Sequence, residues 1–247
     1  MSILTKIIMK ELPILFSAPM IRAILDGRKT MTRRIVKSQF NTVWGSGCPN
    51  ESTFTLMNGG QRWKDAFAVH VDRQTASGHW EWLFCPYGKP GDRLYVKETF
   101  YAWGRWVTRF DPKKQRDEWH FIDLTLESGK QYQYAEPEGY QKSQRGGVLP
   151  TWWKRPAIFM PRTASRITLE ITGVRVERLQ SIAEADALAE GIQALPGGGF
   201  GVNEPFSAEN TACEAFRLLW DSINGKRASW ESNAWCWVVE FNQLKTQ

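Results

Sequence analysis

The segment Gly27-Arg28-Lys29-Thr30-Met31-Thr32-Arg33-Arg34 decides how this chain is organised. It follows an amphipathic run, residues 17–26, in which Met20, Ile21, Ile24 and Leu25 recur at helical spacing and form one apolar stripe. Gly27 ends the predicted helix, and the β-branched residues beyond it favour an extended chain. The sequence therefore predicts a helix-to-strand corner with Lys29 at the turn.

The residue types at this corner suit two different roles. In a regular strand Lys29 and Thr32 face opposite ways, so they share a pocket only if the chain is still turning at Lys29. A lysine beside a threonine hydroxyl can serve as base and nucleophile when burial or a neighbouring cation lowers the pKa of the ammonium group. The other interpretation is a solvated basic strand that contacts phosphates and does no chemistry.

Three blocks of the sequence resemble one known family. The corner resembles the signature of the ASCH domain, a member of the PUA-like superfamily of small β-barrels associated with RNA. Residues 90–98, PGDRLYVKE, resemble the second block of that family, and residues 235–241, WCWVVEF, resemble its closing strand. The resemblance implies an α+β fold, a bent mixed β-barrel of the PUA-like type flanked by helices. The longer segments of this chain are similar to those of enlarged phage and prophage members.

The resemblance also implies an activity. Some ASCH proteins are amidohydrolases that remove the acyl group from N4-acetylcytidine, using a Lys and a Thr of the motif and a downstream Glu. On this chain it implies Lys29, Thr32 and Glu190 as catalytic residues, with neither cofactor nor metal. Other members bind RNA or cleave nucleic acid. A non-catalytic RNA- or DNA-binding module of a phage and, third, a nuclease are therefore the alternatives, and the resemblance leaves open whether the chain is an enzyme.

Length and composition fit one folded domain. The chain has 247 residues, of which 42% are hydrophobic and 13% aromatic, enough to bury a full core. We expect a single domain over residues 10–247 with Trp-rich insertions at about 38–89 and 101–157. The formal net charge of +6 suits a polyanionic partner such as RNA, DNA or a modified nucleoside. No obligate protein partner is indicated.

The N-terminus and the cysteines point to the cytoplasm. Lys6, Lys10 and Glu11 interrupt the first apolar run, so no signal peptide or membrane span is predicted. The four cysteines are scattered and are expected to be free thiols. A zinc site is conceivable, but its ligands match no compact spacing. They would be Cys48, His70, His79 and Cys85.

Two carboxylates downstream of the corner lie at informative positions. Glu98 shares a strand face with apolar residues, so it needs a cationic or hydrogen-bonding partner. Residues 181–184, SIAE, form a predicted capping box for a helix that runs through Glu190 and ends at Gly191. Before that helix, Gly173 interrupts an alternating strand and predicts a bend or bulge.

Cations interleaved with tryptophans predict the nucleic-acid contacts. Basic groups can bind phosphates, and indole rings can stack on bases, although the same residues can form a basic rim or a structural layer. The residues expected to contact substrate or nucleic acid are Arg28, Arg33, Arg34, Glu98, Trp152, Trp153, Arg162 and Arg166.

Overall fold

The computed structural model describes residues 9–37, 42–43, 68–72, 80–138, 140, 142, 144–202 and 209–244. Most of the predicted insertion at 38–89, including Cys48 and His79 of the conceivable zinc site, lies outside the described residues. The chain divides into two compact units. The first comprises Met1–Ile14, Pro19–Tyr95 and Ile167–Gln247, and the second comprises Leu15–Ala18 and Val96–Arg166. The insertion expected at 101–157 lies within the second unit, and a single domain over 10–247 stays a prediction.

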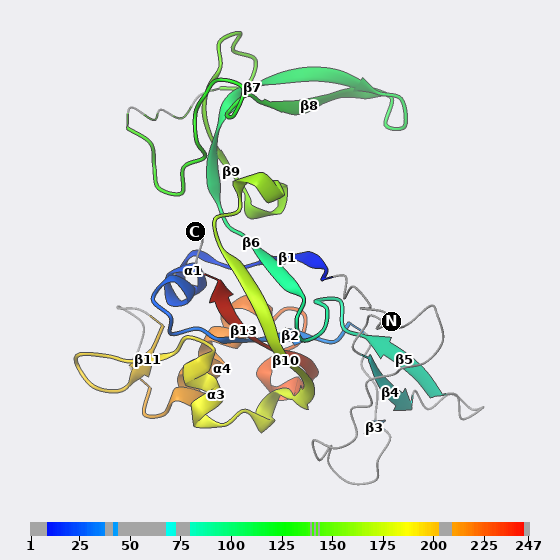
Figure 1. Ribbon diagram of the computed structural model, residues 1–247, viewed down its shortest axis with the longest axis vertical. Helices are drawn as coiled ribbons and strands as arrows, with labels where there is room; N and C mark the ends of the chain where they lie inside the picture. The colour runs from blue at the N-terminus through cyan, green and yellow to red at the C-terminus, as the bar shows by residue number, and fades with distance from the viewer. Residues whose placement is uncertain are drawn as a thin grey trace, which may run out of the picture. The chain divides into compact units, whose positions relative to one another are not determined.

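The fold is mixed α+β with more strand than helix, as expected for the α+β class. The main sheet of the first unit has five strands in the order β1-β6-β10-β13-β2 (Figure 1). Their bounds are β1 Glu11–Leu15, β6 Arg93–Lys97, β10 Thr168–Arg178, β13 Trp235–Leu244 and β2 Met31–Ile35. Strands β1 and β2 form the two edges, and no sheet among the described residues closes into the expected barrel.

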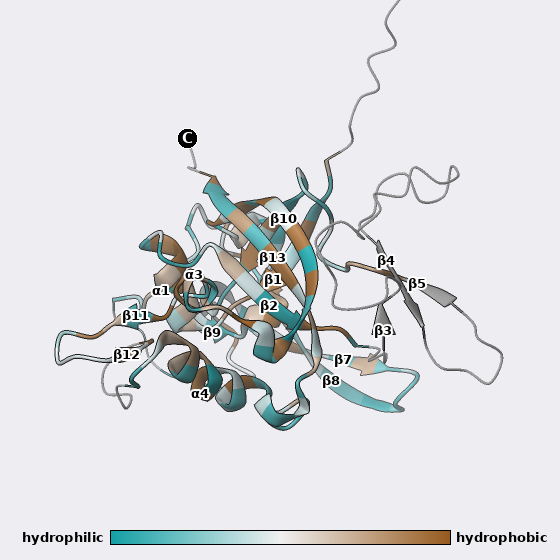
Figure 2. Cartoon of the chain, turned by 90° about the horizontal axis from the view of Figure 1, so that it is seen from below, coloured by the Kyte–Doolittle hydropathy of each residue, from teal (hydrophilic) through white to brown (hydrophobic). Residues whose placement is uncertain are grey.

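The long central pair of strands contains the predicted bend. β10 pairs with β13 in antiparallel register, and the register shifts between Ile171 and Gly173. A Cβ at Gly173 would lie 2.6 Å from a carboxylate oxygen of Glu240, so a larger residue at this bulge would require the Glu240 side chain to move. Apolar and polar residues alternate along these strands in Figure 2, as a sheet with two different faces requires.

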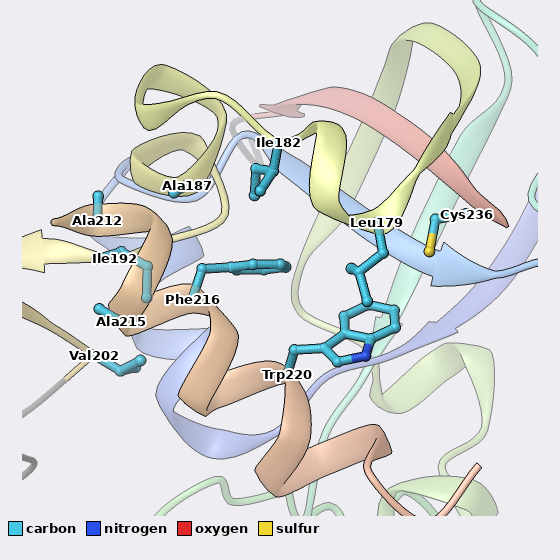
Figure 3. Packing of buried hydrophobic residues seen from close by; sticks show 10 residues of the cluster. All are labelled: Leu179, Ile182, Ala187, Ile192, Val202, Ala212, Ala215, Phe216, Trp220 and Cys236. Carbon is cyan, nitrogen blue, oxygen red and sulfur yellow. The ribbon is translucent and has the colours of Figure 1, made fainter. Parts of the chain in front are cut away.

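Two helices of the first unit share an apolar cluster next to this sheet. The described helices of this unit are α1 Ala18–Leu25, α3 Glu184–Ala189 and α4 Ala212–Asn224, of which α3 and α4 contribute to the cluster. Phe216 and Trp220 of α4 belong to a buried cluster with Leu179 and Cys236, and Figure 3 shows Trp220 pointing toward Leu179. None of the helices in the described ranges combines the length and the apolar character needed to cross a membrane.

The capping box predicted at residues 181–184 is wrong. Ser181 ends a short 3₁₀ helix, and α3 begins after Ala183 with no side-chain cap. The Glu184 carboxylate instead accepts backbone N–H bonds from Ala212 and Cys213 at 2.8 and 3.1 Å. The positive end of α4 competes successfully for this carboxylate, because its first N–H groups have no partner within the helix.

The second unit is built on a three-stranded antiparallel sheet in the order β8-β7-β9. Its strands are β7 Phe100–Asp111, β8 Arg116–Asp123 and β9 Thr151–Arg155. The remaining described elements of the chain are β3 Thr42–Val43, β4 Ala68–Asp72, β5 Trp80–Phe84, η2 Ala157–Phe159, η3 Arg162–Ala164, η4 Leu179–Ser181, β11 Gln193–Ala194, β12 Phe200–Gly201 and η5 Trp230–Ser232.

Candidate active site

The helix-to-strand corner predicted from the sequence is present. Gly27 follows α1 with a φ of +73°, a left-handed conformation that suits glycine. The backbone N–H groups of Arg28 and Lys29 both donate to the carbonyl of Ala23 at 2.9 Å, so the chain is still turning at Lys29. This is the condition under which Lys29 and Thr32 can serve one site.

Lys29 and Glu190 form a buried ion pair across 161 residues of sequence. The Lys29 Nζ donates to Glu190 Oε2 at 2.6 Å and to the Glu190 carbonyl at 2.8 Å. Neither side chain reaches solvent appreciably, with exposed fractions of 0% and 4%. Two residues that the resemblance implies to be catalytic are thus in direct contact.

Backbone geometry at the end of α3 delivers Glu190 to this position. Glu190 caps the helix, and Gly191 follows with a φ of +101°. A Cβ on Gly191 would lie 3.0 Å from the Cβ of Ala23 and 3.4 Å from that of Lys29. Glycine therefore lets the end of α3 approach the corner closely, and Thr30 joins the two by donating its N–H to the Ala189 carbonyl at 2.9 Å.

The second carboxylate oxygen of Glu190 binds the edge of the sheet. The Thr30 carbonyl and the Val36 N–H are both hydrogen-bonded to β13, so the N–H groups between them point alternately toward β13 and away from it. The outward N–H of Arg33 donates to Glu190 Oε1 in a short hydrogen bond. Glu190 thus occupies an edge donor that would otherwise be open to other acceptors.

The position of Thr32 follows from this contact. Its carbonyl carbon is bonded to the Arg33 nitrogen that donates to Glu190, so Thr32 lies beside the carboxylate. Thr32 is 4% exposed and pairs with Val239 of β13. Strand alternation puts it on the same face of β2 as Arg34. The structure therefore brings all three predicted catalytic residues into one neighbourhood.

Burial lowers the pKa of Lys29 below its usual range. Desolvation is the largest cause, the charge and hydrogen bond of Glu190 oppose it, and Arg34 and Arg33 lower the pKa further. Burial also lowers the pKa of Arg34, while Tyr87 and Glu190 act in the opposite direction. Lys29 is consequently easier to deprotonate than a surface lysine, the property that a general base needs.

Arg33 forms ion pairs with the carboxylates that surround the site. Its side chain is fully buried, and its NH2 group lies 2.9 Å from Glu177 Oε2 and 2.7 Å from Asp186 Oδ2. Its NH1 group is 3.7 Å from Glu190 Oε1. Arg175 extends this network by pairing with Glu177, Asp186 and Glu240. Arg33 was expected to contact nucleic acid, but burial among carboxylates gives it a structural role in the resting site.

The carboxylates of this network were not predicted from the sequence, although their spacing was visible. Arg175 and Glu177 are two residues apart on one face of a strand. Asp186 precedes Glu190 by four residues, so the two lie one helical turn apart. Only the sheet topology, which puts β10 and β2 on the two sides of β13, brings these pairs to Arg33.

Arg28 lies at the outer side of the corner. Its guanidinium donates to the Gly191 carbonyl at 3.1 Å and pairs with Asp26 at 2.9 Å. Both contacts are partly open to solvent, with exposed side-chain fractions of 28% for Arg28 and 56% for Asp26. Arg28 therefore remains accessible to a ligand at this edge.

Glu98 has the cationic partner that its position requires. Arg166 holds both of its carboxylate oxygens at 2.9 and 3.0 Å, and the guanidinium lies 4.0 Å from the Tyr134 ring centroid. Glu98 and Arg166 were predicted from the sequence as separate ligand contacts. In the second unit they form one bidentate pair, so neither charge is free in the resting structure.

Trp152 and Trp153 lie on opposite faces of the sheet in the second unit, since neighbouring strand residues alternate. Trp152 packs edge-on against Trp103 at 5.6 Å. Trp153 packs against Trp106 at 6.0 Å and donates its indole N–H to the Gly104 carbonyl at 3.0 Å. The two indoles therefore face different sides of this sheet, and their contact with nucleic acid stays a prediction. Arg162 is exposed, with a 3.4 Å contact to the Ser165 carbonyl.

The site has no metal-binding cluster among the described residues and no counterpart among the known proteins compared with the chain. Within the described ranges, no group of three or more His, Cys, Asp or Glu side chains is arranged to hold a metal ion. Comparison of the chain with family models, with curated proteins and with solved structures gave no match.

Proposed function

We propose that Lys29, Thr32 and Glu190 form the centre of an ASCH-type site that recognises a modified nucleoside or nucleic acid and hydrolyses the N4-acyl amide of acetylated cytidine. The observation that carries the proposal is the 2.6 Å contact between Lys29 Nζ and Glu190 Oε2 inside the protein. The three motif blocks also lie in one sheet, as strands β2, β6 and β13. We also propose that the fold is of the PUA-like type and that the protein acts in the cytoplasm.

The buried pair already holds the proton that the reaction needs. Moving one proton from the Lys29 ammonium group to the Glu190 carboxylate converts an ion pair into an amine and a carboxylic acid. These are a general base and a general acid side by side, reached without exchange with solvent. The lowered pKa of Lys29 reduces the free-energy cost of this transfer.

Acylation then uses both partners. Lys29 accepts the hydroxyl proton of Thr32 while the Thr32 oxygen bonds to the acyl carbon. Glu190 gives its proton to N4 as the bond between the acyl carbon and N4 breaks, and cytidine leaves with an amino group. The products of this step are an acyl ester on Thr32, a Lys29 ammonium group and a Glu190 carboxylate.

Deacylation regenerates the Lys29 amine and the Glu190 carboxylic acid, and return of the proton from Glu190 to Lys29 restores the ion pair. Water attacks the ester carbon and gives a proton to the Glu190 carboxylate, and the departing Thr32 oxygen takes one from Lys29. The acyl group leaves as a carboxylic acid, which ionises in water. Arg34 supplies positive charge next to the reacting groups, where a tetrahedral oxyanion would need it.

A non-catalytic RNA- or DNA-binding module is the second candidate. It is favoured by the position of Glu190, which binds Lys29 and the Arg33 backbone and could simply hold a buried corner together. In that case the basic groups at the surface would bind phosphates, and the pair would have no chemical role.

Mass spectrometry of N4-acetylcytidine incubated with the purified protein tests the proposal, with the 2′-deoxy form in parallel. We expect conversion to cytidine and acetate by the unaltered protein, and no conversion by Lys29→Ala. Lys113→Ala, which removes an exposed lysine from the β7–β8 turn, is the matched control and should retain the activity. Absence of conversion of either nucleoside would reject the amidohydrolase and leave the binding module.

A further inference from the structure

A pocket in the second unit combines aromatic rings with cations. It has a volume of about 630 Å³ and is formed by the β7–β8 hairpin, the end of β9 and residues that follow it. Its lining includes Trp106, Trp119, Phe121, Arg145, Arg155 and Phe159. All of these residues lie within Val96–Arg166, so the pocket belongs to this unit alone.

Strand register places three aromatic side chains, Trp106, Trp119 and Phe121, along one side of the pocket, where they form an aromatic wall. Trp106 of β7 is directly opposite Phe121 of β8, with ring centroids 5.3 Å apart. Trp119 is two residues before Phe121 and therefore lies on the same face. Figure 2 shows that β8 is otherwise largely hydrophilic, so these rings stand out on a polar strand.

Two guanidinium groups cover this wall. Arg145 lies 4.3 Å from the ring centroid of Trp106, and Arg155 lies 4.3 Å from Phe121 and 4.9 Å from Phe159. Such cation–π contacts orient the planar groups along the rings.

The cations of the pocket form no salt bridge among the described residues, although the charge of Asp123 acts on Arg155 from beyond ion-pair distance. In the described part of the chain, no carboxylate lies within ion-pair distance of Arg145, Lys154 or Arg155. The one carboxylate in the lining, that of Glu118, is already paired with Arg116 and Lys114 at 2.7 and 3.3 Å. The pocket thus presents positive charge that an anionic ligand could neutralise.

Three aromatic side chains of the pocket are either exposed or lack a hydrogen-bond acceptor among the described residues. Trp119 and Phe159 are 41% and 60% exposed, although large aromatic side chains normally seek cover. The indole N–H of Trp106 is buried and has no acceptor among the described residues. Open rings, unpaired cations and a donor without an acceptor together fit a ligand that has a flat ring, a negative charge and oxygen acceptors.

We propose that this pocket binds a nucleotide, with the base stacked on Trp119 or Phe159 and the phosphate held by Arg145 and Lys154. An acidic peptide would use the cations but would leave the exposed rings uncovered. The nucleotide can come from a single strand or be free in solution, because both present the same base and phosphate. This inference goes beyond the proposed amidohydrolase and does not depend on Lys29.

Fluorescence anisotropy with labelled single-stranded RNA and DNA of about 12 nucleotides, at low and moderate salt, tests the pocket in the full chain. Trp119→Ala and Phe159→Ala should each weaken binding about tenfold, the scale of one lost stacking contact. Phe110→Ala is the matched control, because Phe110 is also 60% exposed but is absent from the pocket lining. Arg145→Ala should lower the slope of log affinity against log salt by about one.

Competition by AMP and CMP identifies the source of the nucleotide. Displacement of the labelled strand by either would assign the pocket to free nucleotides, and binding of the strand without such competition would assign it to single strands. Loss of affinity in Phe110→Ala equal to that in Phe159→Ala, or no binding of any probe, would overturn the inference. For the unaltered protein, hydrolysis of N4-acetylcytidine without strand binding would contradict the pocket alone, and strand binding without hydrolysis would contradict the amidohydrolase alone, so the two proposals fail separately.

Discussion

The Nζ of Lys29 lies 2.6 Å from Oε2 of Glu190, with both side chains inside the protein. Two charges removed from water are stable only while each compensates the other, and removing one leaves an uncompensated charge. The pair therefore connects the stability of the corner to whatever chemistry the corner performs.

Breaking this pair should cost far more than breaking an exposed one. We expect Lys29→Met to lower the free energy of unfolding by about 3–5 kcal/mol, and the double variant with Glu190→Gln to lose less than the sum of the two single losses. Urea unfolding of the four proteins measures the coupling. Asp26→Asn, which breaks the partly exposed pair with Arg28, is the control and should cost about 0–1 kcal/mol. Additive losses would show that Lys29 and Glu190 do not depend on each other.

Local sequence signals predicted the corner well. The apolar stripe before Gly27 became α1, the β-branched segment became β2, and the interruption at Gly173 became a register shift between β10 and β13. Each of these features depends on residues that are close in sequence, so spacing and glycine conformation suffice to predict them.

Contacts between distant segments were harder to predict. Glu184 looked like part of its own helix cap, but it binds the start of α4, a segment 28 residues away. The carboxylates around Arg33 were hard to predict for the same reason, since they come from β10 and α3. A local pattern cannot show which of several possible partners the tertiary fold will bring closest.

Gly191 should be needed for its close approach as well as for its backbone conformation. Gly191→Ala places a Cβ against Ala23 and Lys29, and it also forces alanine into a positive φ. Gly198→Ala is a matched control, because Gly198 has a φ of +93° with nothing within 4 Å of its would-be Cβ. Both should lose about 1–2 kcal/mol from the backbone, and Gly191→Ala should lose about 1–3 kcal/mol more from crowding. Equal melting temperatures for Gly191→Ala and Gly198→Ala would show that a Cβ at position 191 is not crowded.

Cys236, which pairs with Ile35 of β2, gives a prediction about pH. Burial raises the pKa of its thiol from 9.0 to about 12, with Arg33 opposing and Glu190 and Glu177 adding to the rise. The unfolded thiol ionises first, so this contribution to stability is present below about pH 9 and is lost as pH rises toward about 12. From about pH 8 to about pH 10, under reducing conditions, the unaltered protein should lose about 1.4 kcal/mol more than Cys236→Ala. If the difference in the free energy of unfolding between the unaltered protein and Cys236→Ala stays constant over this pH range, the pKa of the Cys236 thiol is not raised.

Substitution of Glu190 by glutamine separates the enzyme from the binding module. The glutamine side chain would keep the shape and could still accept the Arg33 N–H, but it could not give a proton to the departing N4. If the proposed mechanism holds, kcat for N4-acetylcytidine should fall by roughly 10²–10⁴-fold, the usual scale of general acid catalysis. The measurement should use saturating substrate, at a temperature where circular dichroism shows the variant folded, because loss of the pair also destabilises the corner. Asp26→Asn should leave kcat unchanged. If the unaltered protein hydrolyses the amide and Glu190→Gln does so at the same rate, another group supplies the proton, and Asp186, which pairs with Arg33 at 2.7 Å, is the next carboxylate to test.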